Sequence, residues 1–220
     1  MSADREREAL SWLYSFADQE RGLGWNPAAS ADAQWNLPRV RALLERAGWP
    51  DRSLRVVLVA GTKGKGSSAA LLASVLDAAG SRVGLFTKPH LQSYRERVRV
   101  GGAAIDGATL AERVAALRPL IDGLPGGPPT TFELTTVLAV AHFAERHCRF
   151  AVMEVGLGGR LDATNALESE LSIITSIGRD HTAILGNTLG AIAREKAGIL
   201  RRERPALIAP QRPAAATALA

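Results

Sequence analysis

Apolar residues near the start of the chain recur at helical spacing. Within residues 4–16, one face of a helix would gather the apolar side chains Ala9, Leu10, Trp12, Leu13 and Phe16. This pattern predicts a helix over that segment. Residues 18–36 have no such periodicity and contain several glycines and a proline, which predicts a loop. Two aromatic residues of that loop, Trp25 and Trp35, must either pack or meet a ligand.

A second helix is predicted from Pro38, with its boundary at Asn36 or Leu37, to Gly48. From residue 54 onward, short apolar runs alternate with helical patterns. The predicted strands are residues 54–60, 82–87, 96–100, 150–155, 171–175 and 205–209. The predicted helices are the segment that ends at Ala79, then 107–121, 131–147 and 189–197. We therefore predict an α/β fold of P-loop type, with a mostly parallel sheet and helices on both faces.

Composition narrows the class of protein. The chain has 220 residues, of which 46% are hydrophobic and 22% charged, as in a folded soluble protein. A single cysteine, Cys148, excludes a disulfide framework and a cysteine-based zinc site. The charged start of the chain lacks the apolar run of a signal peptide, and no stretch matches a membrane span. We expect a cytoplasmic protein without a membrane partner.

The basic residues are unevenly divided between arginine and lysine. The formal net charge is +5, and four of the 27 basic residues are lysines: Lys63, Lys65, Lys88 and Lys196. Nucleotide bias in the genome explains a surplus of arginine. A lysine is nevertheless required where a site needs a compact charge or an amine that can become neutral. The four lysines are therefore candidate functional residues.

The strongest local motif joins a predicted strand to a predicted helix. Its residues are Gly61, Thr62, Lys63, Gly64, Lys65, Gly66 and Ser67. Glycines let backbone N–H groups turn toward a phosphate, the helix presents its positive end, and Lys65 adds a full charge. The motif departs from the common P-loop because Gly66 stands where serine or threonine usually follows the lysine. We interpret it as a nucleotide phosphate site.

Polar residues follow other predicted strands of the sheet. Glu154 ends a very apolar strand, and a carboxylate at that position beside a phosphate loop is where P-loop enzymes hold magnesium. In the next loop, Arg160 and Asp162 could simply pair with each other. His181 follows another strand, and a lone histidine is usually structural. Thr130 and Glu133 fit a helix capping box.

Seven ordered motifs, the glycine-rich loop and six others, together resemble one family. They run from LRVVLVAGTKGKGS through FTKPHLQSYRERVRV, TFELTT, VMEVGLGGRLDATN and SIGRDHTAILG to AREKAGI and LIAPQ. The sequence is similar to folylpolyglutamate synthase and dihydrofolate synthase, a branch of the Mur ligase superfamily. The resemblance implies an ATP-dependent ligase that adds L-glutamate to dihydropteroate or folate through an acyl phosphate. It implies ATP and Mg²⁺ as cofactors, small-molecule substrates, no nucleic acid, and a monomer when full length.

The resemblance also assigns residues. It implies that the motif 61–67 binds ATP, with Lys65, His181 and a carbamylated Lys196 as catalytic residues. It makes Glu154, His181 and Lys196 the magnesium ligands. Its substrate-binding residues are Thr130, Thr131, Phe132 and Glu133, with Phe132 stacked on the pteridine, and Leu161, Asp162 and Ala163.

Two departures from the family stand out. The family usually has an amide in place of Lys63, and a serine that helps to bind magnesium in place of Lys88. Because an ammonium cannot ligate a metal, we expect Lys88 to contact phosphate instead. Relatives also continue past LIAPQ, so we expect residues 1–50 to pack on an incomplete ATP-binding domain at 51–220, without the C-terminal glutamate-ligase domain.

Three alternatives remain open from the sequence. Another Mur-type ligase would share the ATP chemistry but need a different acceptor pocket. A non-catalytic nucleotide-binding remnant would fit an incomplete chain. A basic nucleic-acid module is suggested by Arg95, Arg97 and Arg99 on one strand face, although no base-stacking aromatic pattern accompanies them.

Overall fold

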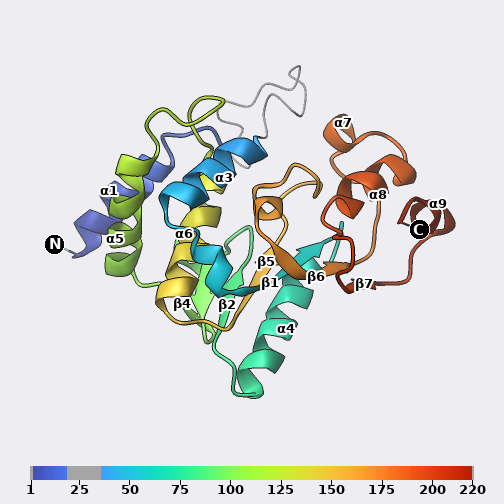
Figure 1. Ribbon diagram of the computed structural model, residues 1–220, viewed down its shortest axis with the longest axis horizontal. Coiled ribbons are helices and arrows are strands. Elements are labelled where there is room, and N and C mark those ends of the chain that lie inside the picture. The colour runs from blue at the N-terminus through green and yellow to red at the C-terminus, as the bar shows by residue number, and fades with distance from the viewer. Residues whose placement is uncertain (1, 19–35, 220) are drawn as a thin grey trace.

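The computed structural model describes residues 2–18 and 36–219. The predicted loop that contains Trp25 and Trp35 therefore lies almost entirely outside the described residues. Figure 1 shows a central sheet between helices, with the chain ends on opposite sides of the molecule.

One sheet of seven strands forms the centre of the described part of the chain, in the order β4-β3-β2-β5-β1-β6-β7. The strands are β1 Arg55–Ala60, β2 Val83–Phe86, β3 Val98–Val100, β4 Ala103–Ala104, β5 Phe150–Glu154, β6 Ser169–Ile174 and β7 Ala206–Ile208. Strands β2, β5, β1, β6 and β7 are parallel, whereas β3 runs antiparallel to β2 and β4 antiparallel to β3. The predicted mostly parallel α/β sheet is confirmed.

The α-helices of the described residues are α1 Ser2–Leu13, α3 Leu37–Arg46, α4 Lys65–Ala78, α5 Gly107–Leu117, α6 Thr131–Glu145, α7 Thr182–Leu185, α8 Leu189–Ala197 and α9 Pro213–Leu219. Short 3₁₀ helices are η1 Pro50–Ser53, η2 Tyr94–Arg97, η3 Arg118–Leu120 and η4 Ala163–Ala166. The sequence pattern predicted the longer helices but neither α7 nor α9, because each is too short to show helical periodicity.

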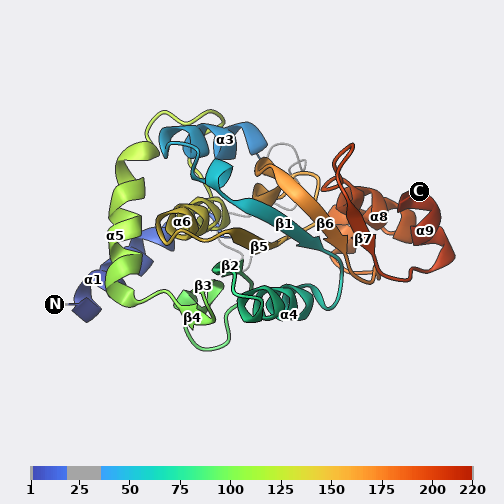
Figure 2. The same cartoon turned by 60° about the horizontal axis from the view of Figure 1, so that its bottom comes forward.

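The two faces of the sheet are covered separately (Figure 2). Helix α4 covers one face and packs there with Val57 and Val59 of β1. Helix α6 lies on the other face, where Val56 and Leu58 point into the larger core. Neighbouring residues of β1 thus alternate between the faces, and both sets are buried. This explains why a parallel strand appears in the sequence as a continuous apolar run.

The N-terminal helices belong to the same packed structure. Helix α1 lies against α5, and Leu13 of α1 and Leu43 of α3 are buried in the core shared with α6. Arg39 of α3 forms a buried ion pair with Glu133 of α6, with Nη2 and Oε1 2.8 Å apart. Residues 1–50 were expected to pack on the rest of the chain, and the described helices do so. A domain boundary at residue 50 stays a prediction.

The region predicted as an edge strand at 96–100 differs from the prediction. Residues 94–97 form the 3₁₀ helix η2, the strand begins only at Val98, and β4 provides the edge. Arg95 and Arg97 therefore do not share a strand face with Arg99. Arg97 is buried, and its Nε donates to Nδ1 of His90 at 2.9 Å. The predicted row of arginines, which suggested a nucleic-acid module, is not present.

Candidate active site

The loop between β1 and α4 has a backbone conformation that requires glycine at two of its positions. Gly64 caps α4 with φ 81°. Gly61 has φ 149°, and a Cβ atom on it would lie 1.7 Å from Oγ1 of Thr175. Thr175 therefore packs directly against the backbone at the end of β1, and a side chain at Gly61 would displace it. The loop leads straight into the N-terminus of α4, where free N–H groups attract anions.

Hydrogen bonds fasten this loop to the segment that follows β6. The Thr62 N–H donates to the Ser176 carbonyl at 2.9 Å. The Gly178 N–H donates to Oγ1 of Thr62 at 3.0 Å, and the hydroxyl of Thr175 donates to the Lys63 carbonyl at 2.8 Å. These contacts fix the backbone before any ligand binds. The positioning role of Thr175 was missed in the sequence, where it appeared only as the polar end of an apolar strand.

Glu154 lies next to the start of α4. It ends β5, the neighbour of β1, and is only 4% exposed. Its Oε2 accepts a hydrogen bond from the backbone N–H of Lys88 at 3.0 Å. A Cβ atom on Gly66 would lie 3.0 Å from that same oxygen. The absence of a side chain at Gly66, which distinguishes this motif from the common P-loop, therefore allows the helix to approach the carboxylate.

The lysines of the chain gather around this loop. Burial lowers the pKa of Lys65; the carboxylate of Glu154 opposes this shift and the charge of Lys88 adds to it. Lys63 points outward with its side chain 83% exposed, and its Nζ is 3.7 Å from Oδ2 of Asp180. Asp180 was not among the predicted site residues. Its only signal in the sequence is its place directly before His181, after a strand.

Lys196 reaches the loop from α8. It is 5% exposed, and its Nζ donates to the Gly61 carbonyl at 2.7 Å. Burial lowers its pKa to about 8, with a further contribution from the charge of Lys65. At neutral pH an appreciable fraction of this amine is therefore uncharged, unlike an ordinary lysine. Lys196 lies in the last turn of α8, where the helix dipole favours a cation, but that position alone does not account for its burial.

His181 occupies a strained backbone position at the start of α7, with φ 48°. Its imidazole is exposed, and Nε2 lies 3.8 Å from Oδ1 of Asp180. Partial burial lowers its pKa, as do the charges of Lys88 and Lys196, whereas Asp180 raises it. A neutral imidazole has a free lone pair for a metal or a proton.

A second group of predicted residues meets beside the loop after β5. A Cβ atom on Gly156 would lie 2.7 Å from Cζ of Phe132 and 2.8 Å from Oδ2 of Asp162. Lys88 reaches the same place, with its Nζ 5.9 Å from the centre of the Phe132 ring. Asp162 accepts hydrogen bonds from the Leu157 N–H at 2.8 Å and from the Thr164 hydroxyl at 2.6 Å. An aromatic ring, a carboxylate and an ammonium thus converge next to Glu154.

The protonation of Asp162 is set by its surroundings. The residue is 4% exposed, and burial raises its pKa although the hydrogen bonds and the charge of Lys88 oppose the shift. The two residues next to it in the sequence differ in solvent exposure, since Leu161 is half-buried and Ala163 is buried.

The segment 130–133 divides into two kinds of residue. Thr130 and Glu133 form the predicted capping box, with the Thr130 N–H donating to Oε2 of Glu133 at 2.7 Å. Glu133 also binds Arg39, and the Thr131 hydroxyl donates to the Leu13 carbonyl at 2.9 Å. The side chains of Thr131 and Glu133 are thus hydrogen-bonded to other residues inside the protein. Phe132 alone turns its ring toward the site, so direct substrate contact by Thr131 and Glu133 stays a prediction that their geometry does not favour.

The donor set fits one magnesium ion that arrives with a nucleotide. Across residues 2–18 and 36–219, no three His, Cys, Asp or Glu side chains gather closely enough to hold a metal by themselves. Magnesium in nucleotide sites needs only one or two carboxylates, because phosphates and waters complete its shell. Glu154, beside the phosphate loop, meets that need. A second ion on His181 and Lys196 stays a prediction.

Family comparison agrees with this arrangement. The model of the Mur ligase middle domain matches residues 59–216. The dihydrofolate synthase/folylpolyglutamate synthase of Bacillus subtilis is 44% identical over 165 residues, which are 73% of this chain and 38% of that protein. The folylpolyglutamate synthase of Lacticaseibacillus casei is 38% identical over 163 residues, 72% of this chain and 38% of that protein.

Solved structures give the same result. An FPGS–AMPPCP–folate complex superposes with a TM-score of 0.86 at 33% identity, over 97% of this chain and 50% of that one. The Mycobacterium tuberculosis folylpolyglutamate synthase complexed with ADP has a TM-score of 0.86 at 32% identity, over 100% and 48% of the two chains. The chain thus spans about half of these structures and less of the curated relatives. Among the helices of the described ranges, none has the length and apolar character that a membrane crossing requires.

Proposed function

The chain belongs to the Mur ligase family, in the branch of the folylpolyglutamate and dihydrofolate synthases, and on that premise we propose that it carries the ATP-binding part of a folate ligase. The reaction is formation of an amide between L-glutamate and the carboxylate of dihydropteroate or a folate. The observation that supports this most is the convergence of the phosphate loop, Glu154 and the Phe132–Asp162 pair at one edge of the sheet.

The phosphate loop holds the nucleotide for transfer. Its N–H groups and the N-terminus of α4 bind the phosphates, and Lys65 orients the γ-phosphoryl group. A carboxylate oxygen of the substrate attacks the γ-phosphorus and ADP leaves, which yields an acyl phosphate. The glutamate amine then attacks the acyl carbon, loses a proton, and phosphate leaves. Magnesium, when bound, offsets the negative charge that the carboxylate and the phosphates bring together.

The pteridine of the substrate lies against Phe132 in this proposal. The half-buried ring offers a flat apolar surface, and Asp162 next to it offers oxygens that accept hydrogen bonds from ring N–H groups. Leu161 and Ala163 flank that carboxylate. Lys88, close to the Phe132 ring and to Glu154, contacts the acyl phosphate or the triphosphate.

Lys196 acts as a carbamate. Its lowered pKa of about 8 supplies the neutral amine, whose nitrogen attacks carbon dioxide and releases a proton. The product is an anion with two oxygens beside the Gly61 carbonyl. Together with Glu154 and His181 it forms the predicted set of magnesium ligands. Cytoplasmic localisation and a monomeric state complete the proposal.

The test is to supply ATP, magnesium and dihydropteroate or folate, with hydroxylamine in place of glutamate. It is run on the 220-residue chain and on the longest reading frame that contains it. We expect the longer protein to form a folate hydroxamate, since hydroxylamine traps the acyl phosphate, and Lys65→Ala to abolish it. Arg7→Gln, on the exposed surface of α1, is the matched control.

The alternatives give different results. Activity with a nucleotide-sugar peptide instead of a pteroate would make the protein another Mur-type ligase. Nucleotide binding without hydroxamate formation from either acceptor, both in the 220-residue chain and in the longest reading frame, would make it a non-catalytic remnant. Either outcome would contradict the proposed function.

A further inference from the structure

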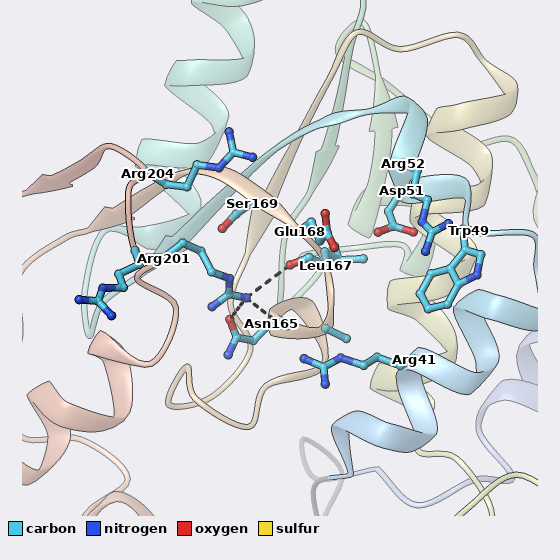
Figure 3. Close-up of a pocket in the computed structure, with 12 residues that line it drawn as sticks. Arg41, Trp49, Asp51, Arg52, Asn165, Leu167, Glu168, Ser169, Arg201 and Arg204 are labelled. Carbon is cyan, nitrogen blue, oxygen red and sulfur yellow. Dashed lines mark hydrogen bonds between the residues drawn. The ribbon is translucent and has the colours of Figure 1, made fainter.

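A cavity of about 540 Å³ lies at the edge of the sheet opposite the phosphate loop (Figure 3). Its walls come from the end of α3 and η1, from the segment that leads into β6, and from the segment before β7. These segments precede β1, β6 and β7, whereas the phosphate loop follows β1. The cavity therefore belongs to the amino-terminal edge of the parallel strands and shares no residue with the site described above.

Positive charge predominates in the lining. Five arginines face two carboxylates: the arginines are Arg41, Arg52, Arg201, Arg202 and Arg204, and the carboxylates are Asp51 and Glu168. No ion pair links one of these arginines to one of these carboxylates in the described part of the chain. Asp51 and Glu168 offset only part of the positive charge, because five guanidinium groups face two carboxylates, and an anion entering the cavity would offset more of it.

Two of these arginines are presented in different ways. Arg201 is held in place, since its Nη2 donates to Oδ1 of Asn165 at 2.7 Å and to the Asn165 carbonyl at 3.0 Å. Arg41 extends toward it from α3 in Figure 3 and makes no hydrogen bond with any described residue. Burial lowers the pKa of Arg201, and the charge of Arg41 contributes to that shift. Two like charges thus face one another across the cavity.

The lining also contains buried oxygens that lack a partner. Oδ1 of Asp51 and Oγ of Ser169 are both buried, and neither has a hydrogen-bond partner among the described residues. Asp51 is 5% exposed and Ser169 is 4% exposed. An unpaired buried acceptor is unfavourable, so such atoms indicate a missing donor. Both oxygens are closed off from the cavity in this structure, so a ligand hydroxyl would pair with them only after the side chains of Asp51 and Ser169 turn toward it.

We propose that this cavity binds a small phosphorylated molecule with hydroxyl groups, of which a sugar phosphate is the simplest. Planar guanidinium groups match the oxygens of a phosphate in pairs, and several of them converge here. The hydroxyl groups would pair with Asp51 and Ser169 once these side chains turn toward the cavity. The volume falls in the range of small-molecule sites, about 300–1,000 Å³. The proposed ligase reaction uses no residue of this cavity.

Trp49 supplies a reporter for the test. It lines the cavity, and the Arg52 guanidinium stacks on its indole 4.4 Å from the ring centre. The ¹⁵N-labelled 220-residue chain is titrated with ribose 5-phosphate, and the indole N–H resonance of Trp49, assigned with Trp49→Phe, is followed. We expect a saturable shift. Arg41→Gln with Arg204→Gln should weaken the affinity about tenfold, as loss of charged hydrogen bonds does.

Matched variants locate the ligand. Arg7→Gln on α1 and Lys65→Ala in the phosphate loop should leave the Trp49 titration unchanged. Ser169→Ala should weaken binding of ribose 5-phosphate and leave binding of inorganic phosphate unchanged, because only the sugar hydroxyls use Ser169.

Three results would overturn the proposal. One is an unmoved Trp49 resonance at millimolar ribose 5-phosphate. A second is equal affinity in the wild-type and Arg41→Gln/Arg204→Gln proteins, which would put the ligand elsewhere. The third is a shift caused by L-glutamate or by a single-stranded oligonucleotide but not by ribose 5-phosphate, which would assign the arginines to a carboxylate or a nucleic acid.

Discussion

The two edges of the sheet both carry positive charge, but on different residue types. All four lysines of the chain lie around the loop at the carboxyl-terminal edge, and five arginines line the cavity at the amino-terminal edge. Burial makes a lysine easier to deprotonate, and it lowers the pKa of both Lys65 and Lys196. Arginine stays charged under all ordinary conditions. The first edge thus suits chemistry that needs an adjustable group, and the second suits binding by fixed charge.

The edges also differ in how firmly their parts are held. At the carboxyl-terminal edge, glycines let the backbone pack against Thr175 and Glu154, and hydrogen bonds link the loops. At the other edge, Arg201 is fixed by Asn165 but Arg41 projects without such contacts. Reaction requires fixed geometry, whereas an anion can draw mobile arginines toward itself.

The largest expected effect concerns Lys196, the lysine whose amine can become neutral. In the longest reading frame that contains this chain, assayed for the proposed ligase reaction, Lys196→Arg should lower the rate of glutamate addition by about a thousandfold, because arginine keeps the charge but cannot form a carbamate. Lys196→Ala should be equally inactive and partly restored by a small carboxylic acid. The measurement is glutamate-dependent release of phosphate.

The matched substitution at the amino-terminal edge is Arg41→Lys, which should leave the rate of glutamate addition unchanged. A near-normal rate in Lys196→Arg would show that the carbamate is not required. A rate reduced by Arg41→Lys as strongly as by Lys196→Arg would remove the distinction between the edges.

The second prediction compares two arginines on one helix. Arg39→Met should lower the free energy of unfolding by about 3 kcal/mol, because it leaves Glu133 buried without its partner. Arg41→Met, two residues away, should change it by less than about 0.5 kcal/mol, because Arg41 lines a cavity and is unpaired among the described residues. Urea denaturation of both variants measures this. Equal losses would mean that Arg41 has a structural role.

A third prediction concerns Lys88, where the family resemblance leads us to expect a serine. In the longest reading frame that contains this chain, Lys88→Ala should slow the proposed phosphoryl transfer about tenfold, since one charge near the phosphates is lost. Lys88→Ser should recover activity with a higher magnesium requirement. Rapid-quench measurement of ADP formation over a range of magnesium concentrations distinguishes them. If neither the rate nor the magnesium dependence changes in either variant, Lys88 has no contact with the phosphates.

The smallest effect is a pH dependence at the arginine edge. Burial raises the pKa of Asp51, and the carboxylate of Glu168 adds to the shift, although Arg52 opposes it. The folded protein then loses stability as pH rises from the usual aspartate pKa through the raised one, because the unfolded chain ionises first. Asp51→Asn should therefore stabilise the ligand-free protein at pH 7 but not at pH 3. Thermal unfolding at both values checks this, and stabilisation at pH 3 alone would contradict it.

Much of the fold could be predicted from the sequence. The apolar runs of β1, β5 and β6 indicated buried parallel strands because both of their faces are covered. The prediction failed at residues 96–100, where polar and apolar residues alternate over a 3₁₀ turn followed by a three-residue strand. Alternation over so few residues does not distinguish the two. The arginines of that segment were consequently interpreted as one surface row.

Several residues of the candidate active site were named as predictions from the sequence, but their contacts were not, and Thr175 and Asp180 were missed. The motif 61–67, Glu154 and Lys196 follow separate elements, and the sequence could place them only at strand ends and helix ends. It did not indicate that Thr175 would occupy the space of a Gly61 side chain, or that Thr131 and Glu133 would be used inside the core. Those facts depend on which element packs against which.

The sequence by itself determined the order of the longer strands and helices, the glycine-rich motif at 61–67 and the family, because these depend on local patterns along the chain. Only the tertiary structure decided which lysine amine is buried against Gly61. It also decided that five arginines, separated by up to 163 positions in the sequence, line one cavity. Burial and convergence arise from packing between segments that are distant in sequence. The pKa of Lys196 and the unpaired oxygen of Asp51 are consequences of that packing, and no periodicity or motif in the chain encodes them.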